Sequence, residues 1–206
     1  MTGYRGPDSR RNPWKAPKPY GYGPASASAL FIAAPLFTAA ALSLAGVVGG
    51  ADDEFRWPGP ILLILVIAAL ILVASIQLAY YARLHLYSYD DLVTWLGPGY
   101  VEDYETRLRS DQKRDQKIWT RYQLRAVHAF NVGTMLLGVG IAAALVPPVC
   151  GEQPKWRWAA AAVVCAATVI DAIWVTYMHM KALNHRTNWL YRSVRGLIEK
   201  TRRERG

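Results

Sequence analysis

The stretch ILLILVIAALILVASIQLAYY, residues 61–81, decides the fold of this chain. It is rich in Leu, Ile and Val, and no charged residue follows it until Arg83. A helix needs about 20 predominantly apolar residues to cross the hydrocarbon core of a bilayer. We therefore expect residues 61–84 to form a lipid-facing transmembrane helix.

Three further apolar blocks of similar length flank this segment, at residues 25–50, 126–146 and 158–180. Of the 206 residues, 52% are hydrophobic and 19% are charged, and the mean hydropathy of +0.07 conceals an alternation of apolar blocks with strongly polar segments. A soluble domain would instead scatter its apolar residues at helix or strand period. The sequence therefore predicts an all-α polytopic membrane protein with four transmembrane helices.

The blocks divide the chain into five segments. We expect, in order, a disordered basic cytoplasmic tail at 1–24, a transmembrane hairpin at 25–84, a cytoplasmic helical segment at 85–125, a second transmembrane hairpin at 126–180 and a basic amphipathic tail helix at 181–206. The first tail is rich in Gly, Pro and basic residues and lacks apolar periodicity. It therefore cannot bury enough surface to offset the entropy of ordering it.

The distribution of cations predicts the orientation, because Lys and Arg in short loops resist translocation and remain cytoplasmic. Of the 24 Lys and Arg residues, 21 lie in the two tails, at the end of the second block or in segment 85–125. Only Arg56, Lys155 and Arg157 lie in the loops on the opposite side of the membrane. We expect both termini in the cytoplasm, the plasma membrane as location, and helices 3 and 4 extended into the cytoplasm.

Segment 85–125 divides at Gly97-Pro98-Gly99, which is a strong helix breaker. Before it, LYSYDDLVTWL predicts a short amphipathic helix. After it, we expect an unbroken helix from about Tyr100 into the third block, supported by the acid-to-base pairs Asp103 with Arg107 and Glu105 with Arg109. This pattern predicts a straight, charged helix that is exposed to water.

The C-terminal tail combines an apolar stripe with a basic face at helical spacing. The predicted interaction face consists of Leu190, Val194, Leu197 and Ile198, and the predicted lipid-headgroup contacts are Arg192, Arg195, Arg202 and Arg203. Such a helix lies flat on anionic inner-leaflet headgroups or packs against segment 85–125. Both interpretations stay open.

Asp171 is the one acidic residue inside a predicted span. Counted from the cytoplasmic ends, Gln77, Asn131 and Thr134 fall with it in the inner half of the bilayer, so an intramembrane polar cluster is predicted. One interpretation is a proton-binding or ion-coordinating site on a conducting path. The other is a neutral, protonated Asp171 that only forms a hydrogen bond from helix to helix.

Sequence signatures of chemistry are missing. The chain contains no HExxH, GxSxG, Walker A or GxGxxG motif, and its four histidines are too separated for a metal site. We expect no catalytic residue, metal, cofactor or nucleic-acid partner. The leading hypothesis is a non-enzymatic multi-pass protein that presents cytoplasmic helices to a soluble protein partner, with homo-oligomerisation open. The alternatives are an oligomeric pore-forming or membrane-permeabilising effector controlled by its cytoplasmic segments, and a small ion-coupled transporter.

Overall fold

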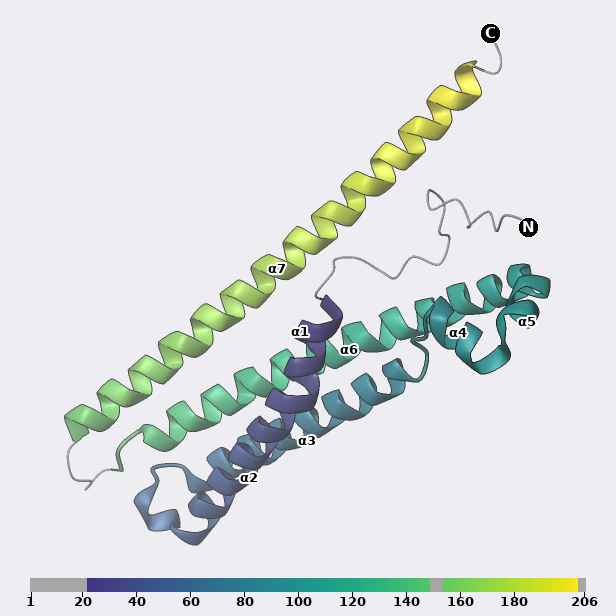
Figure 1. Ribbon diagram of the computed structural model, residues 1–206. Helices are drawn as coiled ribbons and strands as arrows, with labels where there is room; N and C mark the ends of the chain where they lie inside the picture. The colour runs from purple at the N-terminus through teal and green to yellow at the C-terminus, as the bar shows by residue number, and fades with distance from the viewer. Residues whose placement is uncertain (1–21, 149–153, 204–206) are drawn as a thin grey trace. The chain divides into compact units, whose positions relative to one another are not determined.

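The computed structural model describes residues 22–148 and 154–203, with side chains from Ala25 to Met180 except those of 52, 149–153 and 179. Every regular element in these ranges is a helix (Figure 1). The elements are α1 (Tyr22–Ser28), η2 (Ala29–Ala33), α2 (Ala34–Gly50), η3 (Asp52–Glu54), α3 (Pro58–Arg83), α4 (Tyr89–Leu96), α5 (Pro98–Asp103), α6 (Glu105–Leu145) and α7 (Pro154–Arg203).

Four helical segments are long and apolar enough to cross a membrane: Ala25–Gly50, Pro58–Arg83, Glu105–Leu145 and Pro154–Met178. This confirms the all-α class and the four predicted blocks, and it supports a multi-pass membrane protein. The second span begins three residues earlier than expected, because the fixed φ of Pro58 suits the first turn of a helix. With 41 and 50 residues, α6 and α7 are about twice the length that a bilayer core requires.

The first span changes its helical form before Pro35. Residues Ala29–Ala33 form the π-helical turn η2, and the Ala34 N–H donates to the Ala29 carbonyl, five residues back. Proline has no N–H, and its ring collides with the carbonyl four residues earlier, here that of Phe31. The wider π turn gives this carbonyl room, so the irregularity follows from Pro35.

The chain divides into two compact units. Unit 1 consists of Met1–Ser43 and Val66–Thr134, and unit 2 of Leu44–Leu65 and Met135–Gly206.

In unit 1, small side chains let helices approach closely. Leu30, Ala79 and Ala126 are at most 1% exposed and form a core against which four larger apolar side chains pack: Phe31, Leu78, Val127 and Phe130. Gly133 lies so close to α3 that an added Cβ would be 2.7 Å from Leu72 Cγ. Close contact through Ala and Gly is a usual way for membrane helices to associate.

In unit 2, glycines serve the same purpose. A Cβ on Gly140 would be 2.7 Å from Leu65 Cδ2, and one on Gly138 would collide with the Thr168 side chain of α7. The Arg157 guanidinium donates to the Ala144 carbonyl at 3.4 Å. Most of the apolar side chains of α7 are nevertheless exposed, among them Ile170, Ile173 and Trp174.

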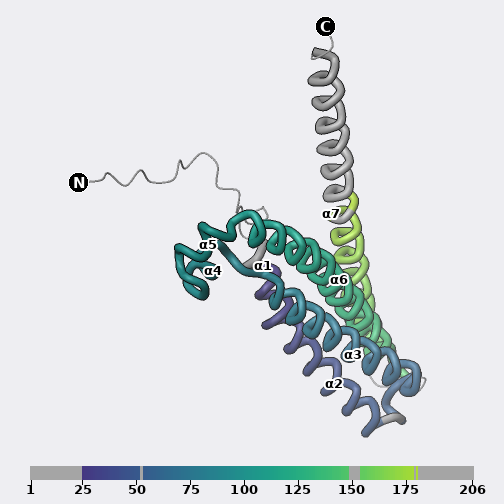
Figure 2. Tube along the Cα trace, turned by 90° about the vertical axis from the view of Figure 1, so that its right-hand side faces the viewer, coloured from purple at the N-terminus to yellow at the C-terminus, as the bar shows by residue number. Residues whose placement is uncertain are grey.

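The prediction of an unbroken helix from about Tyr100 is wrong at one residue. Helix α5 ends at Asp103, and Tyr104 has φ −109° and ψ 20° before α6 begins. No Gly or Pro causes this break. Helix α5 contacts α4 and buries Val101, so the chain must turn at Tyr104 to enter the axis of α6 (Figure 2). Of the two expected pairs, the structure forms Glu105 with Arg109, which both lie in α6.

Candidate functional site

Unit 1 holds two candidate sites, of which the first is built on α4. Ser88 caps this helix: its hydroxyl accepts from the Asp91 N–H at 3.1 Å, and the Asp91 carboxylate accepts from the Ser88 N–H at 2.7 Å. The backbone N–H and then the hydroxyl of Ser88 hold the pKa of Asp91 below its usual value. This reciprocal capping gives an eight-residue helix a defined beginning.

Two hydrogen bonds tie the segment before α4 to α6. The Tyr87 hydroxyl donates to the Asp115 carboxylate at 3.0 Å, and the Gln112 amide donates to the Tyr87 carbonyl at 3.3 Å. Partial burial raises the pKa of Tyr87 to about 12, helped by the bond to Asp115 and by the charges of Asp115 and Asp111. The position of α4 is therefore set by contacts some 25 residues away in sequence.

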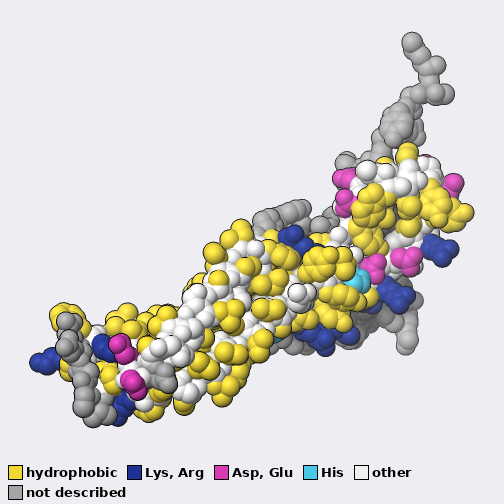
Figure 3. Space-filling model, turned by 90° about the horizontal axis from the view of Figure 1, so that it is seen from below, with side chains coloured by type: hydrophobic (Ala, Val, Ile, Leu, Met, Phe, Trp, Pro, Cys, Tyr) yellow, Lys and Arg dark blue, Asp and Glu magenta, His cyan; other side chains and the backbone are white. Residues whose placement is uncertain are grey.

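The exposed side of α4 and α5 carries large aromatic side chains. Leu92 and Val101 are buried, whereas Trp95 is 67%, Tyr100 49% and Tyr104 47% exposed. Figure 3 shows hydrophobic and acidic side chains gathered together over this part of the protein. We call Trp95, Tyr100 and Tyr104 the α4–α5 surface.

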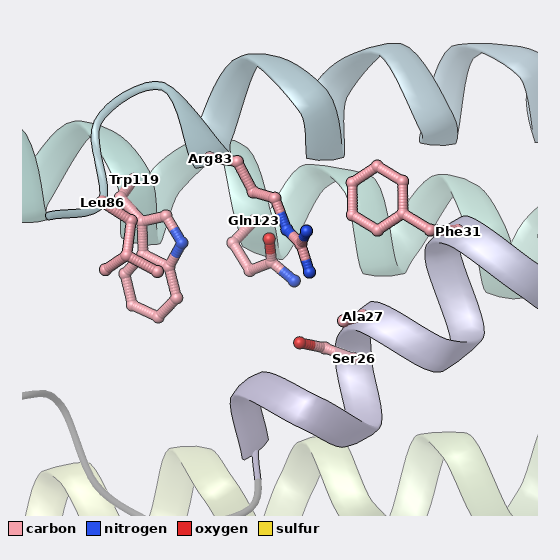
Figure 4. Close-up of a pocket in the computed structure, with 7 residues that line it drawn as sticks. All are labelled: Ser26, Ala27, Phe31, Arg83, Leu86, Trp119 and Gln123. Atoms are coloured by element: carbon pink, nitrogen blue, oxygen red, sulfur yellow. The ribbon is translucent and has the colours of Figure 1, made fainter.

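The second site is a cavity of about 310 Å³ between the first helices of the chain, the end of α3 and the middle of α6 (Figure 4). Its lining residues are Ser26, Ala27, Phe31, Arg83, Leu86, Trp119 and Gln123. We call it the Arg83 cavity. It combines one cation and several hydrogen-bonding groups with an apolar wall.

Two buried polar side chains line this cavity. Gln123 is 6% and Trp119 7% exposed, and their spacing of four residues places them on one face of α6. Within the described part of the chain, neither the Gln123 amide nor the Trp119 indole N–H has a hydrogen-bond partner. Both point into the cavity in Figure 4. Their polar atoms are accessible from the cavity, so a molecule bound there can form hydrogen bonds with both side chains.

Arg83 supplies the positive charge. Its guanidinium carbon lies 4.4 Å from the centroid of the Phe31 ring, a cation–π contact between the end of α3 and η2. Among the described side chains, no carboxylate pairs with Arg83. The aromatic ring covers one face of the guanidinium, and its N–H groups lie in the plane and can still donate.

The predicted intramembrane cluster falls on both units. In unit 1, Gln77 is exposed, whereas Asn131 and Thr134 are partly buried. The Thr134 hydroxyl donates to the Phe130 carbonyl of its own helix at 2.8 Å. Asp171 belongs to unit 2 and is exposed on α7. The association of Asp171 with the other three residues stays a prediction.

The predicted tail contacts lie outside the described side chains. The backbone of α7 continues to Arg203 without a break. The interaction face and the headgroup contacts both fall beyond Met180, the last described side chain: Leu190, Val194, Leu197, Ile198, Arg192, Arg195, Arg202 and Arg203. The predicted N-terminal tail also lies almost wholly outside the described residues.

Sequence reasoning missed the Arg83 cavity. Two signals pointed to it: Arg83 is the first charge after the most apolar span, and Trp119 with Gln123 interrupts a strongly charged stretch at helical spacing. Neither signal reveals that Phe31, more than 50 residues before Arg83, faces them. Within the described residues, no group of three or more His, Cys, Asp or Glu is placed to hold a metal ion.

In comparisons with known proteins, no family model, curated protein or solved structure matches this chain.

Proposed function

We propose that this chain is a non-enzymatic plasma-membrane protein with four spans and both termini in the cytoplasm, which presents α4, α5 and the polar part of α6 to a soluble protein partner. The 21 of 24 cations on one side of the four spans support this orientation. In this arrangement the polar beginning of α6 and the end of α7 extend into the cytoplasm.

The α4–α5 surface carries this proposal. A short helical pair that is capped by Ser88 and anchored through Tyr87 to Asp115 is an ordered structure rather than a solvated linker. It nevertheless leaves Trp95 two-thirds exposed. Exposed aromatic side chains on a rigid support are typical anchors of protein interfaces, because they bury a large area at a small entropic cost.

Cysteine labelling tests the orientation. In a variant whose own Cys150 and Cys165 are replaced by serine, a new cysteine at Asp53 should react with a membrane-impermeant maleimide in intact cells. One at Ser110 should react only after the cells are opened. The opposite pattern would place α4 and α5 outside and remove them from any cytoplasmic partner.

Site-specific photocrosslinking tests the partner. A photoreactive amino acid at Trp95 should give a discrete crosslinked protein in living cells, whereas the same group at Lys117, which is exposed on α6, should not. Tyr100→Ser should weaken the crosslink from Trp95, because it removes a neighbouring anchor. Equal products from both positions, or lipid adducts alone, would contradict the proposal.

One observation favours self-association into a pore as a second candidate. Asp171 is exposed on α7 between the exposed apolar residues Ile170 and Trp174, and an acidic side chain facing lipid is costly. A second copy that covers this face would remove the cost. Ion flux through the purified protein in liposomes, abolished by Asp171→Asn, is the expected result for a pore or an ion-coupled transporter, and absence of flux contradicts both.

A further inference from the structure

We propose that the Arg83 cavity binds the phosphate group of an anionic phosphate ester, with Arg83 as the cation and Gln123 and Trp119 as neutral hydrogen-bond donors. This binding site is separate from the α4–α5 surface, and it does not depend on which side of the membrane the termini occupy.

The first argument is the charge at the site. Arg83 lines the cavity without a partner carboxylate among the described residues, and no acidic residue lines it. The Phe31 ring at 4.4 Å holds the guanidinium in place while leaving its in-plane N–H groups able to donate. A preorganised guanidinium matches the oxygens of a phosphate by geometry as well as by charge.

The second argument is a pair of hydrogen-bonding side chains that open onto the cavity. The residues Gln123 and Trp119 are each more than nine-tenths buried, and both lie on the cavity wall from one face of α6. An indole N–H can only donate, so its partner must be an acceptor. An oxygen-rich anion therefore satisfies Trp119, Gln123 and Arg83 together, as no cation would.

The third argument is the depth of the site in the bilayer. The chain has no charged residue between Arg56 and Arg83, so Arg83 stands where the apolar part of α3 ends. That position corresponds to the headgroup level of a bilayer. Basic pockets between transmembrane helices at this level accept lipid headgroups. Phe31 and Leu86 supply an apolar wall for the glycerol and first acyl carbons of a lipid.

Binding to the full-length protein in a neutral detergent tests the site with three probes: dioctanoyl phosphatidylglycerol, dioctanoyl phosphatidylcholine and inorganic phosphate. Isothermal titration should show saturable binding of the phosphatidylglycerol and at least tenfold weaker binding of the zwitterionic lipid. Weak binding of inorganic phosphate identifies a lipid as the source of the phosphate. Inorganic phosphate that binds as tightly as the lipid, and that depends on Arg83, identifies a soluble phosphate ester at the same site.

Two arginines provide a matched comparison. Arg83→Gln should weaken binding about tenfold or more, since it removes the charged donor. Arg125→Gln is the control, because Arg125 also stands at the boundary of an apolar block and contacts an aromatic ring, that of Tyr122 at 5.6 Å, but does not line the cavity. The affinity of the Arg125→Gln variant for phosphatidylglycerol should change less than twofold. Equal losses in both variants would indicate general charge attraction and overturn the site.

Gln123→Leu separates binding from folding. Because the amide has no partner within the described protein, replacing it with an apolar side chain of similar size should not lower the thermal stability of the lipid-free protein. The same variant should bind phosphatidylglycerol several-fold more weakly. Unchanged binding in Gln123→Leu, or equal binding of both lipids to the wild type, would overturn the proposal.

Discussion

Different kinds of contact stabilise the interior of each of the two units. In unit 1, side-chain hydrogen bonds and aromatic contacts add to the packing: Tyr87 bonds Asp115, Phe37 stacks on Phe130 with ring centroids 6.0 Å apart, and Tyr81 meets Tyr122 edge-on at 4.6 Å. In unit 2, the close contacts run through glycines 138 and 140. Aromatic contacts between helices thus add to the packing of unit 1, whereas close approach through glycines brings the described helices of unit 2 together.

Gly140→Leu should cause the largest loss of stability, since it disrupts the close helix packing of unit 2. Even the first added carbon would stand 2.7 Å from Leu65 Cδ2, so the buried Leu65 side chain or the helices must shift, at a cost of about 1–3 kcal/mol. Resistance of the purified protein to unfolding by SDS, followed by tryptophan fluorescence, measures the loss. Gly46→Leu is the control, because a Cβ there meets no atom within 4 Å. A loss of the same size in the control would show that bulk alone is responsible.

Tyr87→Phe should have a smaller and local effect in unit 1. It removes the hydrogen bond to Asp115, worth about 0.5–1.5 kcal/mol, and leaves the ring in place. Hydrogen exchange at the amides of α4 should accelerate, while exchange in α3 should not change. Tyr100→Phe is the matched control, since the Tyr100 ring is half exposed. If both variants behave alike, the bond to Asp115 does not position α4.

Alkaline pH should loosen the attachment of α4 to α6, because ionisation of Tyr87 breaks its hydrogen bond to Asp115. The pKa of Tyr87 in the folded protein, about 12, lies above the ordinary tyrosine value of 10.0, so the folded state favours the neutral phenol. The stabilisation is fully present below pH 10 and is lost as the pH rises toward 12. Proteolysis near Gly97 should increase over this window in the wild type, and Tyr87→Phe should show a smaller change. Identical pH profiles would contradict the role of Tyr87.

Acid should have the smallest effect, confined to the cap of α4. Hydrogen bonds from Ser88 lower the pKa of Asp91, so the cap contributes stability above the ordinary Asp pKa and loses it as the pH falls through the lowered value. Because this carboxylate is exposed, we expect only faster amide exchange in the first turn of α4 at low pH. Asp91→Asn should abolish the pH dependence of this exchange, and a persisting dependence would implicate another group.

Local properties of the chain were predictable from the sequence. Each span is recognised by about 20 apolar residues, and the first span ends at Gly50 in the structure, as expected. The end of α4 was also predictable, because Gly97 adopts φ +83°, a conformation that glycine accepts without strain. Length, hydropathy and backbone freedom can be read within one segment, so no knowledge of its neighbours is needed.

Contacts between distant segments were decided only by the tertiary structure. The break at Tyr104 has no Gly or Pro to announce it and follows from the packing of α5 against α4. The Arg83 cavity likewise exists because the close approach of helices through Ala79 and Ala126 brings Phe31, Arg83 and Gln123 to one place. Hydropathy says that a helix crosses the membrane, but the rotation and pairing of helices depend on the fit of their surfaces, which is a property of several segments at once.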